Sequence, residues 1–246
     1  MQAAGKVALL TGAKRIGAVV AETLAAEGVD IALTYHRSGG EADATVRAVQ
    51  AVGRRAVAIQ ADLGHVDECR RAVDVTLAEL GRLDIFIAMA GLYESTSFEK
   101  MSPDIWDAQM NVELRSAFLC AHAAVPAMKR QGGGRMIFFS DWLPTSGRPR
   151  YKGMLTYYVA KAGLKALAEA MALELAGDQI LVNAIAPGPI LAPPTTSAEE
   201  HAAVASATPL GRWGGAAEIA KAVRFLIESD FVTGETIRVD GGRHLS

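Results

Sequence analysis

Short apolar runs alternate with longer amphipathic stretches along the whole chain. The apolar runs have few polar interruptions, which is typical of strands buried on both faces of a parallel sheet. Seven runs are expected to form strands: residues 6–11, 29–34, 55–60, 84–90, 135–140, 180–185 and 235–239. The stretches between them place apolar residues three and four positions apart, which predicts helices over residues 17–27, 41–52, 66–80, 103–131, 155–176 and 216–229.

The alternation of strand and helix predicts an α/β fold built from repeated right-handed βαβ units. Such units form a doubly wound parallel sheet, here of about seven strands flanked by helices. No linker rich in Pro, Gly or Ser interrupts the 246 residues, so we expect one domain over residues 1–246. Residues 188–209 are rich in proline and small residues and are expected to leave the sheet, as a mobile substrate lid or as a surface loop.

Composition and charge narrow the class of protein. Half of the residues are hydrophobic, which is enough for one large core, and a net charge of −2 lacks the basic excess of a general nucleic-acid binder. No apolar run approaches the roughly 18 residues of a spanning helix, and residues 1–6 do not begin a secretory signal. Cys69 and Cys120 have no CxxC spacing, which fits a reduced protein. We therefore expect a cytoplasmic protein that binds neither nucleic acid nor membrane.

The first predicted strand runs directly into a glycine-containing loop that precedes a helix. Glycines in such a loop let the backbone approach a pyrophosphate, whose charge the helix N-terminus stabilises. Only two glycines are present, so an ordinary strand–helix connection explains the loop equally well when it is taken alone. The residues expected to bind a dinucleotide here are Gly12, Lys14, Arg15, Ile16 and Gly17.

The second and third predicted strands end in polar residues. An NAD site would carry a carboxylate about 20 residues past the glycine loop, whereas His36, Arg37 and Ser38 stand there. A guanidinium and a hydroxyl suit the 2′-phosphate of NADP(H), so NADP(H) is favoured over NAD(H), with a solvated basic turn as the alternative. Asp62 and Leu63 close the third strand, where the carboxylate would accept a hydrogen bond from the adenine amine or simply form a turn.

Tyr157 and Lys161 lie four residues apart on a predicted helix, so they share one face. An ammonium beside a phenol stabilises the phenolate, and we expect it to lower the pKa of Tyr157 toward working pH. Such a tyrosine gives a proton to a substrate while a hydride arrives from a nicotinamide. A surface pair without function explains the spacing alone, but the helix follows a strand that should end beside the glycine loop.

Polar residues near this helix complete the candidate site. The fifth strand ends in Ser140 and Asp141, either of which would bond the substrate or the tyrosine, unless they only form a turn or a helix cap. The carboxylate of Asp141 could itself relay protons if its pKa were raised. Asn111 lies inside a long predicted helix, where it would bend the helix around a water, hold the lysine through one, or simply face solvent.

With these residues assembled, the chain resembles a short-chain dehydrogenase/reductase over essentially all of its length. The motifs stand in the family's order: the glycine loop, Asp62, Asn111, Ser140-Asp141, Tyr157 with Lys161, Asn183-Ala184-Ile185-Ala186-Pro187-Gly188 and Val239-Asp240-Gly241-Gly242. The resemblance implies a single-domain Rossmann fold and an NAD(P)-dependent hydride transfer with Tyr157 as proton donor. Lys161 would bind the nicotinamide ribose and Asn111 would support the proton path. Residues of the loops after the fourth and sixth strands would border the cofactor: Ala90, Gly91, Pro187, Gly188 and Ile190.

Departures from the family pattern resemble pteridine reductases. Arg15 occupies the place of the middle glycine in the usual family loop, and His36-Arg37-Ser38 follows the second strand. Asp141 best matches the position where the family usually has its catalytic serine. In that branch the arginine contacts cofactor phosphate and substrate, and an aromatic residue, here matched by Tyr93, stacks on the pterin. Three additional residues within 142–151 would reshape the substrate pocket. The residues expected to contact substrate are therefore Arg15, Tyr93, Ser140, Asp141 and Trp142.

Three hypotheses about function follow. The first is an NADPH-dependent reductase of a dihydropterin-like C=N or a small carbonyl, with Tyr157 as acid and Asp141 as a second proton donor or relay. The second is a 3-oxoacyl thioester or general carbonyl reductase of the same family, in which Asp141 only positions Tyr157. The third, from another class, is a dinucleotide-sensing protein with weak catalysis. The family resemblance also implies a homotetramer, packed through the helices at 103–131 and 155–176.

Overall fold

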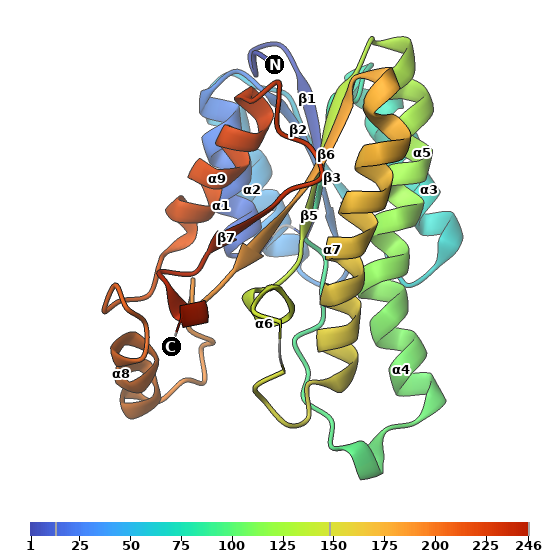
Figure 1. Ribbon diagram of the computed structural model, residues 1–246. Coiled ribbons are helices and arrows are strands. Elements are labelled where there is room, and N and C mark those ends of the chain that lie inside the picture. The colour runs from blue at the N-terminus through green and yellow to red at the C-terminus, as the bar shows by residue number, and fades with distance from the viewer. Residues whose placement is uncertain (13, 148, 246) are drawn as a thin grey trace.

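The computed structural model describes residues 1–12, 14–147 and 149–245, and its centre is a seven-stranded parallel sheet (Figure 1). The strand order is β3-β2-β1-β4-β5-β6-β7, and every neighbouring pair is parallel. The strands are β1 (Val7–Thr11), β2 (Asp30–Tyr35), β3 (Ala56–Gln60), β4 (Ile85–Ala88), β5 (Gly134–Phe139), β6 (Ile180–Pro187) and β7 (Thr236–Val239). The predicted doubly wound sheet of about seven strands is confirmed.

Helices cover both faces of the sheet, as predicted from the spacing of apolar residues between the strands. On one face lie α1 (Ile16–Ala26), α2 (Gly39–Ala51) and α9 (Ala216–Glu228); on the other lie α3 (Val66–Leu80), α4 (Pro103–Met110), α5 (Ser116–Arg130) and α7 (Leu155–Leu175) (Figure 1). Short 3-10 turns occur at Phe98–Lys100, Ala176–Asp178 and Arg243–Leu245.

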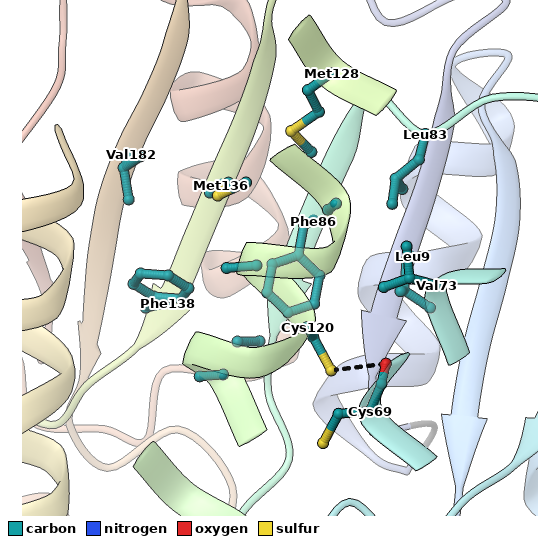
Figure 2. Packing of buried hydrophobic residues seen from close by; sticks show 14 of the residues in the cluster. Leu9, Cys69, Val73, Leu83, Phe86, Cys120, Met128, Met136, Phe138 and Val182 are labelled. Atoms are coloured by element: carbon teal, nitrogen blue, oxygen red, sulfur yellow. Dashed lines mark hydrogen bonds between the residues drawn. The ribbon is translucent and has the colours of Figure 1, made fainter. Parts of the chain in front are cut away.

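Two apolar clusters fill the space between sheet and helices, and alternate residues of each strand supply them. Leu10, Leu33 and Ile87 point toward α1 and α9, whereas Leu9 and Phe86 point toward α3 and α5. Figure 2 shows the second cluster. In it the rings of Phe86 and Phe138 are arranged edge to face, with their centroids 6.4 Å apart. Each fully buried side chain of this size contributes about 1.5–3 kcal/mol of burial free energy. Burial on both faces explains why the strand sequences are almost continuously apolar.

The two cysteines lie within the second cluster. Cys69 of α3 and Cys120 of α5 are both buried free thiols, and the Cys120 thiol donates to the Cys69 carbonyl at 3.6 Å (Figure 2). They act there as small packing residues between the two helices. Over the described ranges no helix is long and apolar enough to cross a membrane.

The long helix predicted over residues 103–131 is interrupted. Helices α4 and α5 are joined by a π-helical turn, η2 (Asn111–Arg115), and Ser102 caps the start of α4 by accepting from the Ile105 amide at 3.2 Å. π turns are rare, and many occur at functional sites. The turn fixes which residues of this helix face the interior of the molecule.

Two segments beyond the carboxyl edge of the sheet contain short helices. Residues 188–209, expected as a lid or loop, include α8 (Ala198–Ser206), which begins with a capping box between Ser197 and Glu200. The segment at 142–151 includes α6 (Trp142–Thr145), capped by Asp141. Arg148 of that segment lies outside the described residues. Both segments lie beyond the end of the sheet to which the carboxyl ends of the strands point (Figure 1).

Candidate active site

The carboxyl ends of β1, β4, β5 and β6 lie at one edge of the sheet because all strands are parallel. The chain crosses from β3 at one side of the sheet to β4 beside β1, so a switch in winding direction occurs between β1 and β4. In open parallel sheets the crevice outside such a switch point is the usual ligand site. The candidate residues named from the sequence follow these strand ends.

The glycine loop after β1 requires glycine at two positions, at Gly12 for its backbone conformation and at Gly17 for lack of space. Gly12 has φ +101°, and a Cβ added to Gly17 would lie 2.1 Å from the Gly12 carbonyl oxygen. Helix α1 starts at Ile16 without a side-chain cap, and of its first amides that of Gly17 donates to the Lys14 carbonyl at 2.9 Å. Close backbone approach and uncapped amides together fit a pyrophosphate. Ala13 of this loop lies outside the described residues.

The two basic residues of the loop are engaged with other segments. Arg15 has φ +52°, and its Nη2 donates to the Ala192 carbonyl at 2.6 Å, which bridges the loop to the segment after β6. The Lys14 ammonium lies 3.4 Å from a carboxylate oxygen of Glu41 in α2. Both remain beside the mouth of the crevice, where a phosphate could replace these exposed partners.

The ends of β2 and β3 come together as expected. His36 and Arg37 are exposed after β2, and Ser38 is the buried residue before α2. Asp62 Oδ2 lies 3.7 Å from His36 Nε2 and the same distance from His65 Nε2, while its Oδ1 accepts from the Gly64 amide at 3.0 Å.

Leu63 has a different environment from its neighbour Asp62. Its side chain is buried in the core, and its carbonyl accepts from the Cys69 thiol at 3.3 Å. Only the backbone of Leu63 therefore remains for a cofactor contact.

The loop after β4 forms the wall between the glycine loop and the catalytic candidates. The Thr11 hydroxyl accepts from the Met89 and Ala90 amides at 3.0 and 3.2 Å, which ties this loop to β1. A Cβ on Gly91 would lie 2.9 Å from Glu113 Oε1. Gly91 is therefore required by the buried carboxylate behind it.

Tyr157 and Asp141 are in direct contact. The Tyr157 hydroxyl donates to Asp141 Oδ2 at 2.9 Å, and Asp141 Oδ1 accepts from the Leu143 amide at 2.8 Å. Burial raises the pKa of Asp141 to about 6, although the bonds from Leu143 and Tyr157 and the charge of Lys161 oppose the rise. The exposed ring of Tyr93 stands edge-on to Tyr157 at 5.2 Å.

Lys161 lies beneath this pair on the next turn of α7. Its Nζ donates to the Phe139 carbonyl at 2.9 Å and lies 2.8 Å from Glu113 Oε2. Burial, and then the charges of Asp141 and Glu113, raise the pKa of Tyr157 well above its usual value. The expected net lowering of this pKa by Lys161 is therefore wrong, because burial and the charges of two carboxylates together outweigh one ammonium.

Asn111 does not reach this group of side chains. Its amide oxygen accepts from Arg115 Nη1 at 3.4 Å, and it lines an outer groove beside Phe118 and Ala170. Glu113, two positions along the same turn, faces inward and contacts Lys161 instead. The Asn111 side chain therefore makes no direct contact with Lys161, since residues two apart on a helix lie on nearly opposite faces.

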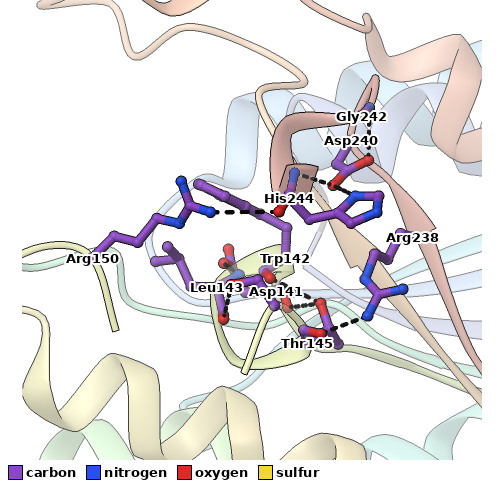
Figure 3. Close-up of polar contacts among 10 residues, drawn as sticks. Asp141, Trp142, Leu143, Thr145, Arg150, Arg238, Asp240, Gly242 and His244 are labelled. Atoms are coloured by element: carbon purple, nitrogen blue, oxygen red, sulfur yellow. Dashed lines mark hydrogen bonds and ion pairs between the residues drawn. The ribbon is translucent and has the colours of Figure 1, made fainter. Parts of the chain in front are cut away.

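Two residues expected at the substrate are also placed elsewhere. The Ser140 hydroxyl is buried and donates to the Lys161 carbonyl at 2.8 Å, which anchors α7 to β5. Trp142 is buried, with the guanidinium of Arg150 5.0 Å from the centre of its ring (Figure 3). The guanidinium of Arg243 lies 5.7 Å from the same ring centre. Both side chains support the site from behind, so neither is exposed to a substrate in the crevice.

The strands β6 and β7 fix the last part of the site. The Gly188 amide donates to the Val239 carbonyl at 2.9 Å, and a Cβ on Gly188 would lie 2.5 Å from Asp240 Cβ. Asp240 in turn accepts from the Gly242 amide and from the His244 ring (Figure 3). This packing sets the path of Pro187 and the buried Ile190 along the crevice.

Asn183 of the same motif has a supporting position. Its amide bonds the Val232 carbonyl and the Glu235 amide at 2.9 and 3.0 Å. These bonds attach β6 to the turn before β7. The Asn183 side chain therefore stabilises the sheet.

Glu113 is the residue that sequence reasoning missed. Glu113 lies four residues from Gln109 and four from Ala117, on the buried face of the helix, but the polar Gln109 does not mark this face as buried in the sequence. A carboxylate on a buried helix face needs a partner for its charge. Across the described part of the chain, no group of His, Cys, Asp or Glu is arranged to hold a metal ion.

Comparison with known proteins identifies the family. The family described as enoyl-(acyl carrier protein) reductase matches residues 12–244. The chain belongs to the short-chain dehydrogenase/reductase family. It is therefore an oxidoreductase of a family that binds a nicotinamide dinucleotide.

Similar proteins cover nearly the whole chain. A 3-oxoacyl-(acyl-carrier-protein) reductase of Synechocystis is 35% identical over 241 residues, covering 96% of each chain. A reductase of the same name from Staphylococcus aureus is 35% identical and covers 98% of each. Among solved structures, a short-chain dehydrogenase/reductase from Serratia marcescens has a TM-score of 0.91 at 31% identity, covering 99% of this chain and 100% of its own. A blue fluorescent protein from a metagenomic library, in complex with NADPH, has a TM-score of 0.91 at 33% identity and covers 99% of each chain.

Proposed function

We propose that the protein is an NADPH-dependent reductase of carbonyl substrates, with 3-oxoacyl thioesters as the best supported class. The observation that carries the proposal is a continuous series of contacts across the crevice. The glycine loop borders the loop after β4, Gly91 of that loop packs on Glu113, Glu113 pairs with Lys161, and Lys161 underlies Tyr157. A dinucleotide held by the loop would thus reach an ionisable phenol.

The crevice fits such a cofactor along its length. Gly12, Gly17 and the amides of α1 would hold the pyrophosphate. Arg37 and Ser38, with Lys14 nearby, would take the 2′-phosphate, which supports NADPH over NADH. The remaining contacts are assigned to Arg15 and Ile16 at the phosphates, to His36, Asp62 and Leu63 at the adenosine, to Lys161 at the nicotinamide ribose, and to Ala90, Gly91, Pro187, Gly188 and Ile190 at the nicotinamide.

The side chains have distinct tasks in this reaction. Bound NADPH supplies the hydride. The Tyr157 hydroxyl turns from Asp141 to the substrate oxygen and gives it a proton, which requires the un-ionised phenol that its raised pKa maintains. Asp141 orients the hydroxyl beforehand, and its own pKa of about 6 allows it to return a proton to Tyr157 in slightly acidic solution.

The substrate class rests on the relatives. Both curated relatives described above carry the name of 3-oxoacyl thioester reductases and span nearly the same length as this chain. One observation favours a second candidate, a dihydropterin-like C=N. A carboxylate, rather than a hydroxyl, contacts Tyr157, and the exposed Tyr93 ring beside it offers a flat surface for stacking.

One set of assays tests the proposal. Purified protein is supplied with an acetoacetyl thioester or a dihydropterin, each with NADPH and with NADH, and cofactor binding is followed by fluorescence. We expect turnover of the thioester and tighter binding of NADPH than of NADH. Tyr157→Phe should lower the turnover number by at least about 100-fold and leave NADPH affinity nearly unchanged.

Each result opposite to these expectations would contradict one part of the proposed function. Full activity of Tyr157→Phe would exclude the tyrosine as acid, and equal or tighter NADH binding would refute the role of Arg37. Turnover of the dihydropterin alone would select the second candidate. Cofactor binding without turnover of any substrate tried would favour the third hypothesis, in which the protein senses a dinucleotide and has weak catalysis.

A further inference from the structure

Glu113 is a charged residue almost completely buried against the candidate site. The residue is 1% exposed, and its side chain lies in η2 between the loop after β4 and helix α7. Burying a carboxylate costs several kcal/mol unless charge and hydrogen bonds compensate it. The contacts of Glu113 therefore show which groups compensate the cost of burying its charge.

Both carboxylate oxygens of Glu113 are used. Oε1 accepts from the Leu92 amide at 2.6 Å, and Oε2 lies 2.8 Å from Lys161 Nζ. Gly91 gives the carboxylate its space, because a Cβ there would approach both oxygens at 2.9 and 3.0 Å. Glu113 thus joins three segments at the point where the nicotinamide and the phenol would meet.

We propose that Glu113 is a positioning residue whose negative charge keeps Tyr157 in its phenol form and so biases the site toward donating a proton, that is, toward reduction. The inference rests on the proposed reductase function. Its subject is a residue that the family resemblance left unassigned.

The ionisable groups around Tyr157 come from four segments. Asp141 approaches from the end of β5, Glu113 from η2, Lys161 from its own helix and the phenol of Tyr93 from the loop after β4. Two carboxylates and one ammonium leave a net negative surrounding. A phenolate would add a third negative charge in a buried place where screening by water is weak.

The test is the variant Glu113→Gln. Glutamine keeps the length of the side chain and an oxygen for the Leu92 amide, but it removes the charge. The rate of reduction falls where Tyr157 ionises, so this alkaline fall should move to lower pH by about one unit or more in the variant. The reverse oxidation, which needs the phenolate, should gain rate at pH 8–9 relative to reduction.

Two further variants separate charge from shape. Glu113→Asp retains the charge and should keep the wild-type pH profile even where its maximal rate is lower. Glu169→Gln removes an exposed carboxylate of α7 that pairs with Lys165, and it should leave the profile unchanged. An unshifted profile in Glu113→Gln, or the same shift in Glu113→Asp, would overturn the proposal.

A titration without substrate keeps this test independent of the proposed function. The ultraviolet phenolate absorbance of wild type minus Tyr157→Phe reports Tyr157 alone. We expect no ionisation of Tyr157 below pH 10 in wild type and an earlier onset in Glu113→Gln. Ionisation near neutral pH in wild type would refute the role of Glu113 even if that variant does not fold. If no substrate is turned over but the titration behaves as expected, only the reductase assignment fails.

Discussion

Asp141 accepts two hydrogen bonds that favour its charged form, in a buried place that disfavours the charge. One carboxylate oxygen caps α6 through the Leu143 amide, and the other accepts from Tyr157. Burial nevertheless raises the pKa of Asp141 from 3.8 to about 6, so the folded protein binds this proton more tightly than the unfolded chain does. The carboxylate therefore lowers stability above about pH 6, and this penalty disappears as the pH falls toward 3.8.

Asp141→Asn is expected to stabilise the protein in neutral and alkaline solution. The amide keeps the cap of α6 but carries no charge, so the free energy of unfolding at pH 8 should rise by up to about 3 kcal/mol. At pH 4 the gain should nearly vanish because Asp141 is then protonated in the folded state. Urea unfolding at both pH values measures the difference. The exposed Asp74→Asn should change little at either pH, and destabilisation of Asp141→Asn at pH 8 would contradict the argument.

The residue scale also shows where sequence reasoning ends. Tyr157, Lys161 and Asp141 were predictable because their spacing and their place after β5 bring them to one strand end. The raised pKa of Tyr157 was not predictable, since it depends on how deeply the phenol is buried and on the charges that several segments bring near it. The choice between Asn111 and Glu113 likewise required knowing which face of the helix is buried.

At the scale of elements, burial on both faces of the sheet made the strands predictable. The π turn between α4 and α5 was not predictable, because residues 103–131 keep a helical pattern through it. Helices α6 and α8 were missed for another reason. They are short, and their caps at Asp141 and Ser197 resemble ordinary turn residues in sequence.

The start of α1 provides a prediction at this scale. Replacing glycine by alanine inside a helix normally stabilises it by about 1 kcal/mol. Gly17→Ala should do the opposite, because its Cβ would lie 2.1 Å from the Gly12 carbonyl and must displace the glycine loop. We expect a loss of about 1–3 kcal/mol in stability and weaker binding of NADPH, measured by urea unfolding and fluorescence titration.

Gly40→Ala is the matched control for stability. This glycine also lies within a helix, α2, and an added Cβ would meet no atom within 4 Å. It should be neutral or stabilising by a few tenths of a kcal/mol. Equal behaviour of the two variants would show that the loop tolerates a side chain at Gly17, and the close-approach argument would then fail.

At the scale of the whole molecule, the outer face of α4, α5 and α7 is incompletely covered. A groove of about 540 Å³ lies along these helices, between Phe118, which is 43% exposed, and the small residues Gly163, Ala166 and Ala170. Small residues let a second helix approach closely, and an exposed apolar groove is a typical site of protein contact. A second copy of the chain is the partner that fits the homotetramer implied by the family resemblance, since symmetric oligomers pair identical faces.

Ala170→Arg tests this assembly. In the native protein we expect the mass of four chains by light scattering after gel filtration. An arginine in the groove would place a charge and a long side chain between the helices of two copies, so the variant should dissociate into smaller species while its circular dichroism remains native. Ala51→Arg introduces the same residue at the exposed end of α2, on the other face of the sheet, and should leave the mass unchanged (Figure 1). A native mass of one chain would refute the homotetramer, and an unaltered mass in Ala170→Arg would exclude this groove as the interface.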